Sequence, residues 1–192
     1  TKHSDRYQYV LPSYDFTKNL KFENLNGSIN FYSSGNNRLL NTNNLKTSIT
    51  NDVEFSSIDY YTKGGLKNNF NLYFKNLNSL GKNDPTYKSS PRLEGMGIAE
   101  ISTSFPLIKE SLNGQEILTP KLSFRANPGN NMKNYSSSSK IINANNVFEI
   151  NRLGISDSFE AGKSLTLGLD YKVEKTKNNE TSNKFIEFKL AT

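Results

Sequence analysis

Residues Ser164–Val173 have the sequence SLTLGLDYKV, and its alternation decides the fold class. The apolar positions are Leu165, Leu167, Leu169, Tyr171 and Val173, and the residues between them are Ser, Thr, Gly, Asp and Lys. Successive side chains of a β-strand point to opposite faces. This stretch therefore predicts a strand with one apolar face and one polar face.

The same period of two recurs along the chain. Five further segments show it: Leu45–Phe55, Phe70–Phe74, Ala99–Phe105, Leu118–Ala126 and Ile186–Leu190. Two weaker strands are expected near Arg6–Leu11 and Leu20–Tyr32, the second interrupted by a turn or bulge at Asn24–Gly27. The pattern thus predicts about eight strands.

The second face of these strands carries charged and amide side chains, so it is expected to be wet rather than packed against another sheet. A soluble sandwich would show shorter strands and a strongly apolar inner face. Several of the segments approach the 9–11 residues of a tilted membrane-spanning strand. The prediction is therefore an all-β fold, an antiparallel up-and-down transmembrane β-barrel, with residues 1–192 forming part of one outer-membrane barrel domain.

Composition excludes several classes of function. The 192 residues contain no Cys and a single His, His3, so neither a thiolate metal site nor a His-based triad can form within the chain. No segment approaches the roughly 20 apolar residues of a transmembrane helix. The net charge of +6 comes without a dense basic cluster, and nucleic acid is not expected as a partner. We expect no catalytic residues, no metal and no cofactor, and we expect that the chain is not an enzyme.

The connections between the strands suggest an orientation. Asn127–Gly162 is the longest, and membrane barrels carry their long loops outside the cell and their short turns in the periplasm. Asn127–Gly162 is therefore expected to be extracellular, as is Gly81–Pro91. The connections Tyr60–Gly65, Pro106–Glu116 and Glu174–Asn183 are expected in the periplasm.

The chain opens on polar and charged residues instead of a secretory signal, and it lacks the aromatic last residue common in complete outer-membrane barrels. Both observations predict an internal fragment of a longer protein. About eight strands of a larger barrel would leave two unpaired edges, which are costly to expose to lipid. Alone, they are expected to form an open curved sheet or to depend on neighbouring strands.

The region from Ile117 to Val173 resembles a known family. It contains an LTPK strand at Leu118–Lys121, a polar loop, an N-x-F-x-x-N-R-x-x-x-x-D-x-x-E-x-G pattern and a TLGLDY strand at Thr166–Tyr171. Residues that fit the pattern are Phe148, Asn151, Arg152, Asp157, Glu160 and Gly162. This order is similar to the barrel of the lipopolysaccharide-assembly outer-membrane protein family. Tyr9–Pro12 is similar to a further strand of that barrel, and the well-matched part covers about a third of the chain.

The resemblance implies a wall segment of the translocon that assembles lipopolysaccharide in the outer leaflet of the outer membrane. The implied partners are lipopolysaccharide, a plug lipoprotein, the periplasmic bridge proteins of lipopolysaccharide transport and membrane lipid. Two alternatives stay open: a diffusion porin or other outer-membrane transporter, and a soluble β-rich binding or adhesion protein.

Candidate functional residues lie in the long connection and on the polar face. Arg152, Asp157 and Glu160 are expected either to form a salt-bridged loop over the barrel mouth or to line the route of a phosphorylated glycolipid. Arginine binds phosphate bidentately, and carboxylates can hold arginine or divalent cations. The same two interpretations apply to the polar-face charges, which are Lys121, Arg125, Asp170, Lys172 and Glu187.

Overall fold

One antiparallel sheet contains all the regular structure of the described residues. The computed structural model describes residues 8–22, 26–40, 43–111, 114–129, 132–177 and 180–192. Within these ranges there are ten strands and no helix, hence none long and apolar enough to cross a membrane. The eight long strands follow the order β1-β2-β3-β5-β6-β8-β9-β10, while β4 pairs with β5 and β7 with β8. The predicted all-β, antiparallel up-and-down order is confirmed.

The strand bounds agree with the alternating segments and extend them. The long strands are β1 (Gln8–Leu20), β2 (Gly27–Leu40), β3 (Asn44–Ser57), β5 (Lys67–Lys82), β6 (Arg92–Ser104), β8 (Gly114–Asn127), β9 (Gly162–Lys177) and β10 (Glu180–Ala191). The short ones are β4 (Tyr60–Tyr61) and β7 (Leu107–Ser111). Eight long strands match the expected number.

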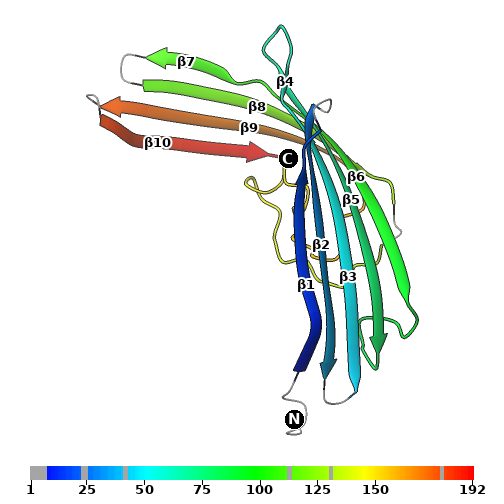
Figure 1. Cartoon of the computed structure of the whole chain (residues 1–192). Helices are drawn as coiled ribbons and strands as arrows, with labels where there is room; N and C mark the ends of the chain where they lie inside the picture. The colour runs from blue at the N-terminus through cyan, green and yellow to red at the C-terminus, as the bar shows by residue number, and fades with distance from the viewer. Residues whose placement is uncertain (1–7, 23–25, 41–42, 112–113, 130–131, 178–179) are drawn as a thin grey trace.

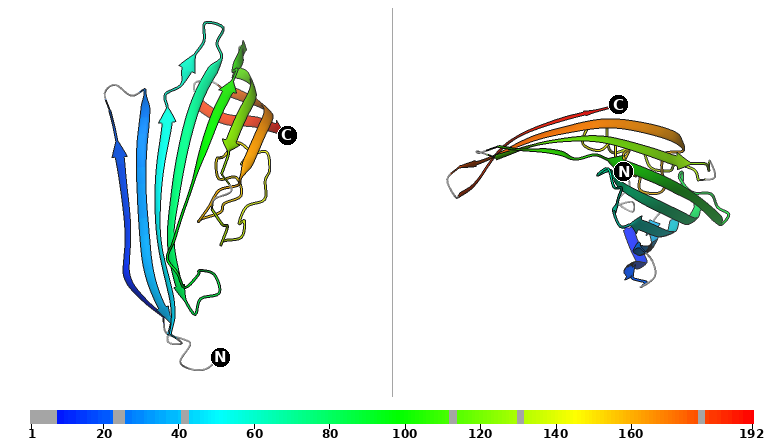
Figure 2. Two further views of the ribbon diagram at one scale, coloured as in Figure 1. Left: turned by 90° about the vertical axis from the view of Figure 1, so that its right-hand side faces the viewer. Right: turned by 90° about the horizontal axis from the view of Figure 1, so that it is seen from above.

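The sheet is strongly curved and open (Figures 1 and 2). Strands β1 and β10 form its two edges and do not pair with each other, which agrees with the open curved sheet expected for these strands alone. The connection between β8 and β9 lies on the concave side of the sheet (Figure 2). We call that side the inner face and the opposite side the outer face.

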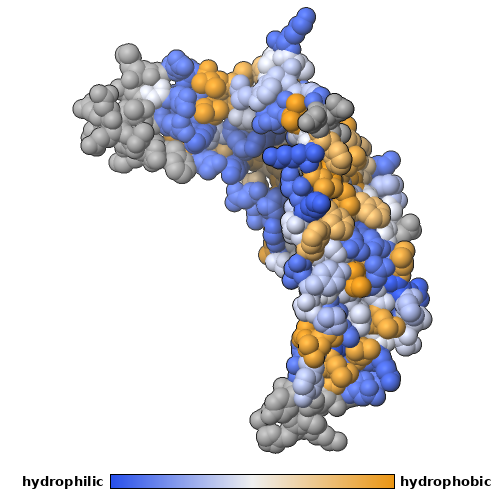
Figure 3. All heavy atoms as spheres, viewed as in Figure 1, coloured by the Kyte–Doolittle hydropathy of each residue, from blue (hydrophilic) through white to orange (hydrophobic). Residues whose placement is uncertain are grey.

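Strand register aligns the apolar positions into a band on the outer face. Val53 of β3 is opposite Phe74 of β5, and Phe124 of β8 is opposite Leu165 of β9. The band also includes Leu72, Ile101, Leu122, Leu167, Phe188 and Leu190, all at least 40% exposed. Figure 3 shows patches of apolar residues over the part of the sheet in which β1, β2, β3, β5 and β6 run. The alternation that predicted one apolar and one polar face is therefore confirmed.

The predicted bounds of one strand and of two connections are wrong. The predicted strand Leu20–Tyr32 combines the last residue of β1 with the first part of β2. The predicted connection Pro106–Glu116 contains β7 and the start of β8, and the predicted connection Glu174–Asn183 contains the end of β9 and the start of β10. The polar sequence of these segments does not indicate a strand, although their backbone pairing continues beyond the apolar band. Outside the described residues lie His3, Arg6 and positions 24–25 of the predicted turn.

Loop length is also a weaker guide to orientation than the sequence suggested. The connections 58–66 and 83–91 are equally long, although they leave the sheet at opposite ends (Figure 1). The first contains β4 and turns at Gly65, which has a φ of 85°. The connection between β8 and β9 remains by far the longest, so the predicted orientation depends on it alone.

Candidate functional site

The β8–β9 connection folds back onto the inner face of the sheet. We call residues 128–161 the inner segment; residues 130–131 lie outside the described part. Its asparagines hold the backbone locally: the Asn151 amide donates to Ile155 O at 2.7 Å, and its side-chain oxygen accepts from Ile155 N at 3.0 Å. Short polar side chains stabilise turns in this way. Gly154, with a φ of 63°, permits the adjacent bend.

Apolar side chains anchor the inner segment. Met132 and Phe159 pack against Leu77 of β5 and against Met96 and Ile98 of β6, and all five are at least 92% buried. Tyr73 makes an edge-to-face contact with Phe159, with ring centroids 6.2 Å apart. This small core lies on the polar side of the sheet, so the inner face is partly dry.

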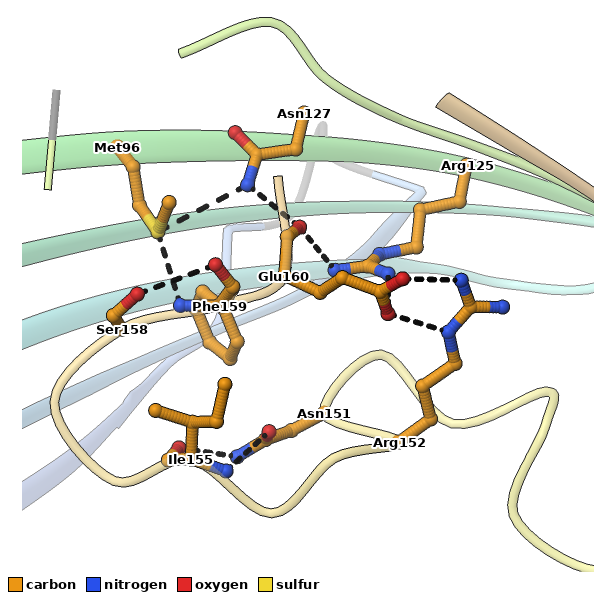
Figure 4. A network of polar contacts seen from close by, with 9 residues as sticks. All are labelled: Met96, Arg125, Asn127, Asn151, Arg152, Ile155, Ser158, Phe159 and Glu160. Carbon is orange, nitrogen blue, oxygen red and sulfur yellow. Dashed lines mark hydrogen bonds and ion pairs between the residues drawn. The ribbon is translucent and has the colours of Figure 1, made fainter. Parts of the chain in front are cut away.

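A charged cluster fastens the end of the inner segment to β8 (Figure 4). Arg152 donates to both carboxylate oxygens of Glu160, from Nε at 2.6 Å and from Nη2 at 2.8 Å. Arg125 donates from Nη1 to Glu160 Oε2 at 3.1 Å and from Nη2 to the Glu160 carbonyl at 2.8 Å. The amide of Asn127 donates to the same carbonyl at 2.9 Å. Glu160 thus accepts hydrogen bonds through both its side chain and its backbone.

The electrostatics follow from this geometry. The hydrogen bonds from Arg152 lower the pKa of Glu160, against the opposing effect of desolvation, and the charge of Arg125 lowers it further. The hydrogen bond to Glu160 raises the pKa of Arg152. Both groups therefore stay ionised near neutral pH. Because Arg152 already binds a carboxylate bidentately, its guanidinium is engaged within the protein.

A backbone contact completes the attachment (Figure 4). The amide of Phe159 donates to the sulfur of Met96 at 3.2 Å. Lys75 of β5 lies 5.2 Å from the centre of the Phe159 ring, forms an ion pair with Asp52 at 2.6 Å and donates to Ser156 O at 3.4 Å. Strands β3, β5, β6 and β8 therefore all contribute to holding the inner segment.

The remaining predicted residues lie outside the arginine cluster. Asp157 accepts from Ser136 at 3.0 Å within the inner segment and does not join the arginine cluster. Lys121 and Asp170 form an ion pair across β8 and β9, and Lys121 lies 5.9 Å from the centre of the Phe148 ring. A Cβ added at Gly168 would lie 2.6 Å from Phe148 Cζ, so the glycine permits this ring to approach β9. Lys172 and Glu187 form ion pairs within their own strands, with Glu174 and Lys189.

Sequence reasoning identified part of this site. It selected Arg152, Glu160 and Arg125, which the structure brings together. It missed Met96, Asn127 and Lys75 because their partners are distant in sequence and because all three contacts involve backbone atoms of the inner segment. The alternation along β8 and β5 places Asn127 and Lys75 on the polar face, and this was the only sequence pattern that could have indicated them.

Among the described residues, no group of three or more His, Cys, Asp or Glu side chains is placed to hold a metal ion. Neither a protein-family model nor a curated protein matches the chain.

Proposed function

We propose that this chain is a wall segment of the outer-membrane translocon that assembles lipopolysaccharide in the outer leaflet. The observation that carries the membrane part of the proposal is the two-sided sheet. On β8 and β9 the outer residues Phe124, Leu165 and Leu167 are 44–61% exposed, whereas the inner residues Arg125 and Thr166 are polar and buried. An apolar band of this extent is costly in water and favourable in a bilayer.

The substrate part of the proposal is supported by the residues that resemble the assembly family. These residues form two neighbouring strands, β8 and β9, and the segment docked on their inner face. Within that segment Arg152 and Glu160 bind each other, so their proposed role is to position the inner segment rather than to bind phosphate. The inner face beside the segment would then line the path of the polar head of lipopolysaccharide.

Partners in this role are lipopolysaccharide, the plug lipoprotein and membrane lipid, with the periplasmic bridge proteins contacting regions beyond this chain. The edge strands β1 and β10 would pair with further strands of the barrel, because unpaired backbone groups are costly in lipid. A diffusion porin remains the alternative. The inner segment argues against a freely open pore along this wall, since it covers the inner face of β5, β6 and β8.

The proposal is tested by depleting the full-length protein in its own cell. Lipopolysaccharide should disappear from the cell surface and accumulate at the inner membrane. Normal surface lipopolysaccharide combined with reduced uptake of small solutes would support the porin instead. A purified chain that stays monodisperse without detergent would contradict a membrane wall and support a soluble binding protein.

A further inference from the structure

A polar cavity of about 410 Å³ lies between the inner face of β2, β3 and β5 and the inner segment. Hydroxyl and amide side chains form much of its wall, and those on β2 and β3 are Ser34, Asn36, Ser48 and Thr50. Charged groups of both signs also line it. The cavity is separate from the Arg125–Glu160–Arg152 cluster, none of whose members lines it.

The cationic part of the cavity is a like-charged pair. Arg38 of β2 and Lys46 of β3 are directly opposite each other, so both side chains point to the same face. In the described part of the chain, neither forms an ion pair with a carboxylate. Lys46 Nζ lies 4.6 Å from the centre of the Tyr87 ring, and its charge also acts on the carboxylate of Asp84. Directly opposed like charges destabilise a sheet, and an anion between them removes that cost.

The acidic part of the cavity contains carboxylate oxygens that lack donors. Asp157 is 93% buried, and its Oδ1 accepts no hydrogen bond within the described residues. Asp52 Oδ1 is buried and unpartnered in the same way, whereas its Oδ2 binds Lys75. Both aspartates line the cavity. A buried acceptor without a donor is costly, so these two carboxylates favour a ligand that presents hydroxyl groups.

Tyr87 connects the two parts. It is 92% buried and lines the cavity beneath Lys46. Its ring makes an edge-to-face contact with Tyr135, with centroids 5.0 Å apart. Paired aromatic rings beside hydroxyl and carboxylate groups provide both an apolar surface and hydrogen-bonding partners for a sugar or polyol ring.

We propose that this cavity binds the phosphate ester of a sugar or polyol. The phosphate lies between Arg38 and Lys46, and the ligand's hydroxyl groups donate to the carboxylates of Asp157 and Asp52. Such a group occurs in soluble sugar phosphates and in lipid headgroups, and the cavity chemistry is the same for both. The inference does not depend on the proposed transport role, because it uses only the lining of this cavity.

The test is calorimetric titration of the full chain in detergent micelles with glucose 6-phosphate, inorganic phosphate or glucose. Glucose 6-phosphate should bind at least tenfold more tightly than either of the other two. A parallel titration uses micelles containing phosphatidylglycerol, whose headgroup is a polyol phosphate. Competition between this lipid and glucose 6-phosphate would identify the headgroup as a second source of the same ligand chemistry. Binding of the sugar phosphate without competition would restrict the ligand to the soluble form.

Two variants make the test specific. Arg38→Gln with Lys46→Gln should weaken glucose 6-phosphate binding at least tenfold, and the variant should fold because the change removes a repulsion. Asp157→Asn should weaken glucose 6-phosphate binding while inorganic phosphate binds equally or more tightly, since a negative charge is lost. Lys63→Gln with Lys109→Gln removes two exposed charges elsewhere and should have no effect. The proposal would be overturned if neither glucose 6-phosphate nor phosphatidylglycerol bound. It would also be overturned if the Arg38/Lys46 variant bound glucose 6-phosphate with wild-type affinity.

Discussion

Arg152 and Glu160, eight residues apart in the sequence, form a bidentate ion pair inside the inner segment with hydrogen bonds of 2.6 and 2.8 Å. Arg125 of β8 binds the same carboxylate from the sheet. Glu160 therefore links two parts of the inner segment to each other and attaches the segment to β8. Since Arg125 is 94% buried, the loss of its carboxylate partner would leave a buried charge unpaired.

We expect Glu160→Gln to loosen the inner segment. The variant keeps the backbone contacts of residue 160 but loses the charged hydrogen bonds, at a cost of about 2 kcal/mol. Hydrogen exchange should accelerate across residues 132–161 and change little in β3. Glu149→Gln is the matched control, because Glu149 pairs with Lys140 at an exposed position. Equal acceleration in both variants would show that the Glu160 cluster does not hold the segment.

Acid should have the same effect as that substitution. The folded protein lowers the pKa of Glu160 below its ordinary value of 4.5, because the ionised form is bound by arginine. The stabilisation is therefore fully present above pH 4.5 and is lost as the pH falls through the lowered pKa. Hydrogen exchange of residues 132–161 should accelerate below pH 4.5 relative to that of β3. The Glu160→Gln variant should lack this acid step, and an unchanged step would assign it to another group.

The packing of the Phe148 ring against β9 should depend on the absence of a side chain at residue 168. Gly168→Ala places a Cβ against the ring, and overpacking of this kind costs about 1–3 kcal/mol, here near the lower value because the ring can move. Phe148→Ala removes the obstacle. Chemical denaturation should therefore show that Gly168→Ala is less destabilising in the Phe148→Ala background than in the wild type. Additive effects would mean that the ring and the strand are not coupled.

Much of the sheet could be predicted from sequence because a period of two leaves a direct signature. Leu165, Leu167 and Leu169 fixed one face of β9, and the register placed them beside matching residues of β8. The signature disappears where strands leave the apolar band. Lys175 and Lys184 are paired in the β9–β10 hairpin although their sequence is typical of a turn.

The path of the inner segment could not be predicted in this way. A long connection without periodicity contains no signal for which face it covers. Its attachment depends on Met96 and Lys75, which belong to strands remote in sequence. Only the arginine–carboxylate composition of the segment indicated that a charged cluster would form, and its position on the inner face required the structure.

Outer and inner positions should differ in their tolerance of charge. Leu167 is 51% exposed on the outer face, and Leu167→Arg should destabilise the protein in bilayers by about 2–4 kcal/mol if the residue lies near the midplane. Thr166 is an unsuitable control, because it is 96% buried on the inner face. Thr17→Arg is better, since Thr17 is an exposed inner position of β1. Folding into lipid vesicles measures both, and equal losses would contradict an outward lipid-facing band.

The two ends of the sheet should lie on opposite sides of the outer membrane. Ser138 lies in the inner segment and Lys63 in the turn after β4, and both residues are exposed. Connections that follow β8 and β4 leave the sheet at opposite ends, so a membrane wall would separate them (Figure 1). Since the chain has no Cys, a cysteine introduced at either position gives a clean signal within it. In the full-length protein on whole cells, Ser138→Cys should react with a membrane-impermeant maleimide, whereas Lys63→Cys should react only after the outer membrane is opened. The reverse pattern would invert the orientation, and labelling of both positions on intact cells would contradict a membrane-spanning sheet.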